Sequence, residues 1–198
     1  DKIEDIENKE FYYFPIHHPL DSQLTYRGKP FVNQIDFIRS IYEFLPYNKF
    51  LVVKEHPHAI GAIGLRELNK IRKLPNIILL HPWVNSHDIL IKSKAVLIIN
   101  STVGLEAYYH NIPVISFGIN YLTGHNICNE VKGFYDMFDM FNNLKMDNSN
   151  FDLFLLNAYR ETYDFLSADF IRKEVSDKQL SNFAYAIDDF ISSKFKTN

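Results

Sequence analysis

Short apolar runs alternate with longer segments of helical spacing from the N-terminus to about residue 117. We expect strands in five apolar runs, at residues 11–16, 50–53, 76–80, 95–99 and 113–117. Between them, apolar residues recur at every third or fourth position, which predicts helices over 31–45, 60–74, 87–93 and 102–110. Fully apolar strands separated by helices indicate a parallel sheet that is covered on both faces.

Right-handed crossovers between such strands give a doubly wound, Rossmann-like α/β domain. We expect this domain to occupy residues 1–135. Residues 136–198 keep the helical spacing but offer no good strand, so we expect C-terminal helices that pack on the same domain or on an absent N-terminal half. The Asn-rich stretch 142–150 is typical of a loop.

Composition narrows the class of protein. Of the 198 residues, 46% are hydrophobic and 23% charged, which is typical of a soluble globular chain. The formal net charge of -3 argues against a nucleic-acid-binding protein, which would usually be basic. The single cysteine, Cys128, excludes an intrachain disulfide and a zinc site built from several cysteines. The N-terminus is acidic, and no apolar run reaches the roughly 18 residues of a membrane span. We expect a cytoplasmic protein. If its acceptor is lipid-linked, we expect the protein to lie peripherally at the inner face of the cell membrane.

Polar side chains that can bind a phosphate group follow three of the expected strands. They occupy residues 17–22, 54–58 and 100–107. In an open parallel sheet, ligands bind beyond the carboxyl ends of the strands, near the point where the strand order reverses. These loops are therefore the candidate site.

The loop after the fourth strand leads into a helix through Ser101, Thr102 and Gly104. Either hydroxyl can cap the helix, and a glycine lets a ligand approach the backbone closely. Unpaired N–H groups at a helix start suit a phosphate. Glu106 lies in the first turn, where it either complements the helix dipole or accepts hydrogen bonds from a ribose. The spacing leaves both roles open.

His56 follows the second strand and precedes a proline, with Lys54 two residues before it. A histidine there can donate to a phosphate oxygen or protonate a departing nucleotide without any metal. The alternative is a loop histidine that caps local backbone. Because His-Pro recurs at His18 and His81, the dipeptide alone favours that alternative.

Three further residues are candidates by position. His17 ends the first strand beside the expected reversal of strand order, opposite the Ser101 loop. Gly118 and Tyr121 follow the fifth strand and are placed to close over a base or sugar, although Tyr121 suits packing equally well. HExxH, GxGxxG and Walker A motifs are absent from the sequence, so we expect no metal and neither a nicotinamide nor a P-loop enzyme.

Taken in order, the loops resemble a known family. Five segments together resemble the capsule polysaccharide biosynthesis family: YFPIHHP at 13–19, VKEHP at 53–57, PNIILLHP at 75–82, NSTVGLEA at 100–107 and IPVISFGINY at 112–121. That family includes bacterial transferases that use CMP-activated Kdo. The resemblance covers roughly residues 11–122. It implies one half of a GT-B glycosyltransferase, the C-terminal domain that binds the sugar nucleotide.

The resemblance also implies roles for residues and partners. His56 would contact the donor phosphate, Ser101 and Thr102 the phosphate or nucleotide, and Glu106 the ribose, with His17 at the same cleft. The donor would be a cytidine-based sugar nucleotide, and the acceptor a glycan or glycolipid. An N-terminal acceptor domain would be missing, and because such a domain often supplies the catalytic base, we name no base here.

Three other functions remain open. A teichoic-acid type transferase with a CDP-polyol donor shares the strand-ending His-Pro and a Ser-rich loop before a helix. A sugar-nucleotide epimerase would prefer UDP. A non-catalytic module of a polysaccharide-assembly complex would use the C-terminal aromatics as an interface, although core packing explains most of these more simply.

Overall fold

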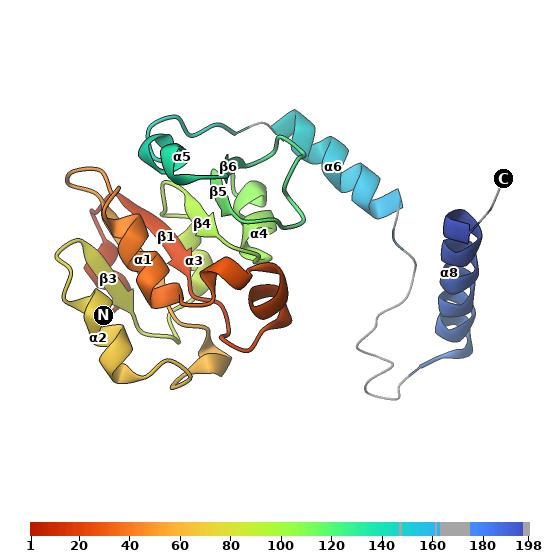
Figure 1. The fold of residues 1–198 in the computed structure, drawn as a ribbon, viewed down its shortest axis with the longest axis horizontal. Coiled ribbons are helices and arrows are strands. Elements are labelled where there is room, and N and C mark those ends of the chain that lie inside the picture. The colour runs from red at the N-terminus through yellow and green to blue at the C-terminus, as the bar shows by residue number, and fades with distance from the viewer. Residues whose placement is uncertain (147, 161, 163–174, 196–198) are drawn as a thin grey trace. The chain divides into compact units, whose positions relative to one another are not determined.

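The computed structural model describes residues 1–146, 148–160, 162 and 175–195 (Figure 1). The chain divides into two compact units, Asp1–Phe151 and Asp152–Asn198. The first unit extends past residue 135, where the sequence pattern placed its end. Met140 and Phe141 explain the extension, because both side chains are buried in the core of the sheet domain.

Six parallel strands form the sheet of the first unit, in the order β3-β2-β1-β4-β5-β6. Their bounds are β1 Phe11–Pro15, β2 Phe50–Lys54, β3 Ile77–Leu80, β4 Val96–Ile98, β5 Val114–Phe117 and β6 Asn129–Val131. This is the strand order of a doubly wound Rossmann domain, so the predicted fold class is confirmed. The pattern missed β6 because this edge strand is only half-buried and two of its three residues are polar.

Both faces of the sheet are covered, and β1 shows how. Four of its five residues, Phe11 to Phe14, are buried, but only Tyr12 and Phe14 of these belong to the main core cluster. Successive side chains of a strand point to opposite faces, so Phe11 and Tyr13 face the other layer. A strand buried on both sides is apolar throughout, which is why it could be found from sequence.

The main core lies under α1 (Gln34–Tyr42) and α2 (Leu65–Arg72), while α3 (Ser86–Leu90) and α4 (Val103–Tyr109) cover the opposite face (Figure 1). The start of α1 is set by Asn33, whose side chain accepts a hydrogen bond from the Asp36 N–H. Ile38 and Ile41 are fully buried on its inner side. The helix therefore holds the loop that leaves β1 firmly against the sheet.

The strand order reverses between β1 and β4, which are neighbours in the sheet. The chain leaves β1 towards α1 on one face and leaves β4 towards α4 on the other. Loops that part in this way open a crevice at the carboxyl ends of the strands. His17 and Asn100 follow the two strands at this point.

The C-terminal part is helical where the structure describes it. It contains α5 (Phe134–Asp139), α6 (Asn148–Arg160) and α8 (Asp177–Phe195). The expected loop at 142–150 ends earlier than predicted, because α6 begins at Asn148. None of the described helices is long and apolar enough to cross a membrane.

Candidate functional site

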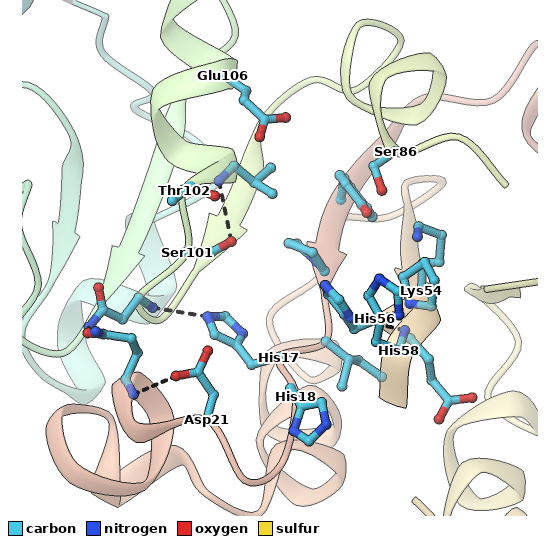
Figure 2. Close-up of a pocket in the computed structure, with 18 residues that line it drawn as sticks. His17, His18, Asp21, Lys54, His56, His58, Ser86, Ser101, Thr102 and Glu106 are labelled. Atoms are coloured by element: carbon cyan, nitrogen blue, oxygen red, sulfur yellow. Dashed lines mark hydrogen bonds between the residues drawn. The ribbon is translucent and has the colours of Figure 1, made fainter. Parts of the chain in front are cut away.

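The loops after β1, β2 and β4 converge on one cavity of about 570 Å³ (Figure 2). Six of the predicted site residues line it: His17, Lys54, His56, Ser101, Thr102 and Glu106. The expectation that the Ser101 and His56 loops meet at the same edge of the sheet is thereby confirmed. Gly104, Gly118 and Tyr121 do not line the cavity.

His17 is fixed from two sides. The side chain of Gln34, in the first turn of α1, accepts from the His17 N–H at 2.8 Å and donates to its carbonyl at 3.0 Å. The Asn100 N–H donates to His17 Nε2 at 3.2 Å. Nε2 is thus an acceptor, so the neutral ring carries its proton on Nδ1. Burial lowers the pKa of His17, which favours this neutral form. The imidazole therefore joins the two loops across the crevice.

The loop after β4 is also held by its neighbours. Asn120 Nδ2 donates to the Ile99 carbonyl at 2.7 Å, and the Tyr121 hydroxyl donates to the Ser101 carbonyl at 2.7 Å. Asn100 Nδ2 donates to Gln23 Oε1 at 2.8 Å. The Tyr121 hydroxyl thus positions the Ser101 loop, which fits the alternative that Tyr121 has a packing role; its contact with a base or sugar stays a prediction.

The two predicted glycines have packing roles. A Cβ on Gly104 would lie 2.8 Å from Ile98 Cδ1, so glycine here lets α4 pack closely on β4. Gly118 has φ +73°, a conformation that favours glycine, and a Cβ there would lie 2.9 Å from Phe31 Cε2. Glycine at position 104 was predicted to let a ligand approach the backbone. The structure explains this glycine by the close approach of α4 to β4.

Ser101 caps the first turn of α4. Its Oγ accepts from the Val103 N–H at 3.3 Å, whereas Thr102 makes no side-chain capping bond. The N–H groups of Gly104 and Leu105 donate to the carbonyls of Ser101 and Thr102. The expected row of unpaired N–H groups is therefore largely satisfied within the turn. What the turn offers the cavity is the Ser101 hydroxyl, whose proton remains available to donate.

All three His-Pro histidines make the same local hydrogen bond. The Nδ1 atoms of His18, His56 and His81 accept from the N–H two residues later, at 3.2, 3.2 and 3.4 Å. The capping alternative is therefore correct for each of them. They differ in location, because His18 and His56 line the cavity and His81 does not.

This cap determines what His56 can do. Since Nδ1 accepts a hydrogen bond, the neutral ring carries its proton on Nε2 and presents a donor. Burial lowers the pKa of His56, and the neighbouring His58 and Lys54 lower it further. Both features favour the neutral imidazole. Of the two predicted roles, donation to an anionic oxygen fits this geometry better than proton transfer to a leaving group.

Lys54 brings a cation to the wall of the cavity. Its Nζ donates to the Pro82 carbonyl at 3.1 Å, which ties the end of β2 to the loop after β3. The residue is only 3% exposed, and burial lowers the pKa of its ammonium. The side chain is thus anchored, and it adds positive potential to a wall that already carries hydrogen-bond donors.

Glu106 lies at the other end of the cavity, near Ser86 and away from His17 and Asp21 (Figure 2). Its Oε2 is 3.8 Å from His87 Nε2, and its side chain is 39% exposed. A carboxylate in this position can accept hydrogen bonds from hydroxyl groups. The cavity therefore has a carboxylate at each end, Glu106 at one and Asp21 at the other, with the donors His56 and Ser101 between them (Figure 2).

Sequence reasoning missed several residues of this site. Gln34 and Asn120 are almost fully buried polar residues that hold the loops, and Tyr13 lies in the wall of the cavity. Asn120 follows an apolar strand, a position that signals a polar network, whereas Gln34 carries no signal within its amphipathic helix. Among the residues that the structure describes, no three His, Cys, Asp or Glu side chains cluster as a metal site.

Comparisons with known structures agree with this architecture. The KpsC beta-Kdo 2,7 transferase of Thermosulfurimonas dismutans superposes with a TM-score of 0.53 at 19% identity, over 72% of this chain and 43% of that one. The beta-Kdo 2,4 transferase of the same organism gives 0.44 at 16% identity, over 67% and 44%. The UDP-GlcNAc 2-epimerase of Methanocaldococcus jannaschii gives 0.49 at 16% identity, over 76% and 46%.

The chain spans less than half the length of each of these three proteins. At such identities the likeness concerns the fold alone, and it rests on the first of these structures, since the other two superpose with TM-scores below 0.5. No curated protein matches the chain significantly. The family comparison is more specific, because the model of the capsule polysaccharide biosynthesis protein family matches residues 1–132, more than half of the sequence. The resemblance seen in the loop motifs is thus confirmed, and this chain belongs to the capsule polysaccharide biosynthesis protein family.

Proposed function

We propose that this chain is the donor-binding part of a glycosyltransferase that builds a bacterial surface polysaccharide, and that its donor is a cytidine-activated sugar such as CMP-Kdo. One observation carries the proposal. The end of β2 and the loops after β2 and β4 bring Lys54, His56 and Ser101 to one cavity at the reversal of strand order. Cavities at this position of doubly wound sheets bind nucleotides.

The donor phosphate belongs between His56 and Ser101, which lie on opposite sides of the cavity (Figure 2). The His56 Nε2–H and the Ser101 hydroxyl each offer a proton, because their other hydrogen-bonding positions are taken by local backbone N–H groups. Lys54 adds a positive charge on the side of His56. Glu106 is placed to accept hydrogen bonds from the ribose hydroxyls, at the end of the cavity where Figure 2 shows its carboxylate.

In the transfer, the bond between the anomeric carbon and the phosphate oxygen breaks as the acceptor oxygen bonds to that carbon. The departing nucleotide gains negative charge, and donors already fixed in place stabilise it more than they stabilise the bound donor. The acceptor loses its proton to a base that we do not assign to this chain. We also propose that the acceptor is a glycan or glycolipid and that a separate domain binds it.

Calorimetric titration of the purified chain tests the proposal. We expect CMP to bind, and His56→Ala to weaken binding by about tenfold to a hundredfold, the loss of one hydrogen bond to a charged oxygen. His81→Ala is the matched control, since His81 makes the same backbone cap outside the cavity. Circular dichroism should show both variants folded. Equal CMP affinity in wild type and His56→Ala would remove His56 from the site.

The nucleotide used separates the remaining functions. Tighter binding of CMP-Kdo than of CDP-glycerol or UDP would support the proposed donor. Preference for CDP-glycerol would favour the teichoic-acid type transferase, and preference for UDP would favour the epimerase. A folded protein that binds none of them would favour the assembly module.

A further inference from the structure

Tyr13 is a buried residue whose hydroxyl has one polar neighbour close enough for at most a weak hydrogen bond, the hydroxyl of Ser86. It lies on β1, on the face away from the main core, and it is 0% exposed. Its side chain lines the cavity, yet its hydroxyl oxygen makes no hydrogen bond of normal geometry. The hydroxyl of Ser86 lies near enough to influence it, as does the carboxylate of Glu106.

Such an orphan is unusual. Most buried hydroxyls are hydrogen-bonded, and leaving one unpaired costs about 1–3 kcal/mol. Phenylalanine would fill the same space in β1 without this cost. The hydroxyl is also a dependable donor, because burial raises the pKa of Tyr13 to about 12. It therefore stays protonated at any physiological pH.

The position of Tyr13 indicates which part of a ligand it meets. Its two polar neighbours, Ser86 and Glu106, lie at one end of the opening, whereas His17 and Asp21 lie at the other (Figure 2). His56 and Ser101, the donors assigned to the phosphate, lie between these two ends in Figure 2. Because Glu106 is the acceptor assigned to the ribose, a ligand whose phosphate contacts those donors would place its nucleoside towards Tyr13 and Ser86.

We propose that the Tyr13 hydroxyl donates a hydrogen bond to an oxygen of the donor's nucleoside, with Ser86 beside it, and so helps to select the nucleotide. The inference rests on the proposed function, and it adds a binding residue buried within the strand itself. The acceptor is a ribose hydroxyl or a carbonyl of the base. Both are neutral oxygens that suit a phenol donor.

The test is titration of the full chain with CMP, UMP, 2′-deoxy-CMP and inorganic pyrophosphate. Tyr13→Phe removes only the hydroxyl, and we expect the dissociation constant for CMP to rise about tenfold. Pyrophosphate, which has no nucleoside, should bind both proteins equally. The matched control is Tyr12→Phe, on the same strand but facing the core, where its ring lies 4.3 Å from that of Phe141. We expect it to leave CMP affinity unchanged.

The other ligands show which oxygen of the nucleoside accepts the hydrogen bond from Tyr13. If Tyr13→Phe reduces the preference for CMP over 2′-deoxy-CMP, the acceptor is the ribose 2′-hydroxyl. If it weakens CMP, UMP and 2′-deoxy-CMP by the same factor, the acceptor is an oxygen that all three share, such as the base carbonyl next to the glycosidic bond. Either result supports the inference. Unchanged CMP affinity in Tyr13→Phe would overturn it and leave the proposed function intact, as would an equal loss for pyrophosphate. A wild-type chain that binds no nucleotide would overturn both.

Discussion

Gln34 gives the sharpest test of how the site is held together. It is 3% exposed and makes two hydrogen bonds to the backbone of His17, at 2.8 and 3.0 Å. Gln34→Met keeps the length of the side chain and removes both partners. The His17 N–H and carbonyl then lie buried and unpaired, at about 1–3 kcal/mol each. We expect the free energy of unfolding to fall by about 2–5 kcal/mol.

Urea and thermal unfolding followed by circular dichroism measure this loss. For a chain of this size, we expect a fall in Tm of about 4–20 °C. Gln23→Ala is the control, because Gln23 is exposed and its Oε1 accepts one hydrogen bond, from Asn100 Nδ2, at the lining of the cavity, where water can replace it. It should cost less than about 1 kcal/mol. If Gln34→Met unfolds within about 0.5 kcal/mol of wild type, the claim that this residue fixes the loop after β1 is wrong.

Two other predictions concern packing and pH. Gly104→Ala places a methyl group 2.8 Å from Ile98 Cδ1 and should destabilise the fold by about 1–3 kcal/mol in urea unfolding. Gly64→Ala is the control and should cost far less, because the space around the new Cβ is open. Equal losses in the two variants would contradict the packing role of Gly104. Burial lowers the pKa of His17, so the unfolded state binds the proton more readily and stability should fall as pH drops below the unfolded value of about 6.5. Melting curves at pH 7.5 and 5.5 should show a smaller fall in Tm for His17→Gln than for wild type, and equal falls would contradict this assignment.

Much of the fold could be predicted because its strands are buried on both faces. Five of the six strands lie where the apolar runs predicted them. β6 could not be found this way, because it is a short edge strand whose Asn129 and Glu130 side chains are polar. The extent of the first unit was also hidden, since Met140 and Phe141 follow the last strand and reveal their burial only when the chain is folded.

The loops of the site could be identified from sequence, because residues after parallel strands meet at one edge of the sheet. The role of each residue within these loops could not be identified in this way. Tyr121 and Gly104 looked like ligand contacts, and the structure gives them a hydrogen bond to the Ser101 carbonyl and a close packing contact. Tyr13 was hidden for the opposite reason, since a tyrosine within an apolar strand is indistinguishable from a core residue until its hydroxyl is placed.

His56 shows why the structural and functional explanations of a residue need not compete. Its Nδ1 caps the following turn, as those of His18 and His81 do. That same hydrogen bond fixes the ring's orientation and leaves the proton on Nε2, so the cap prepares a directed donor before any ligand arrives. A dipeptide that recurs in three loops therefore supplies three oriented donors. The place of each strand in the sheet, and not the dipeptide, separates His18 and His56, which line the cavity, from His81, which does not: β1 and β2 lie at or next to the reversal of strand order, whereas β3 lies at the edge.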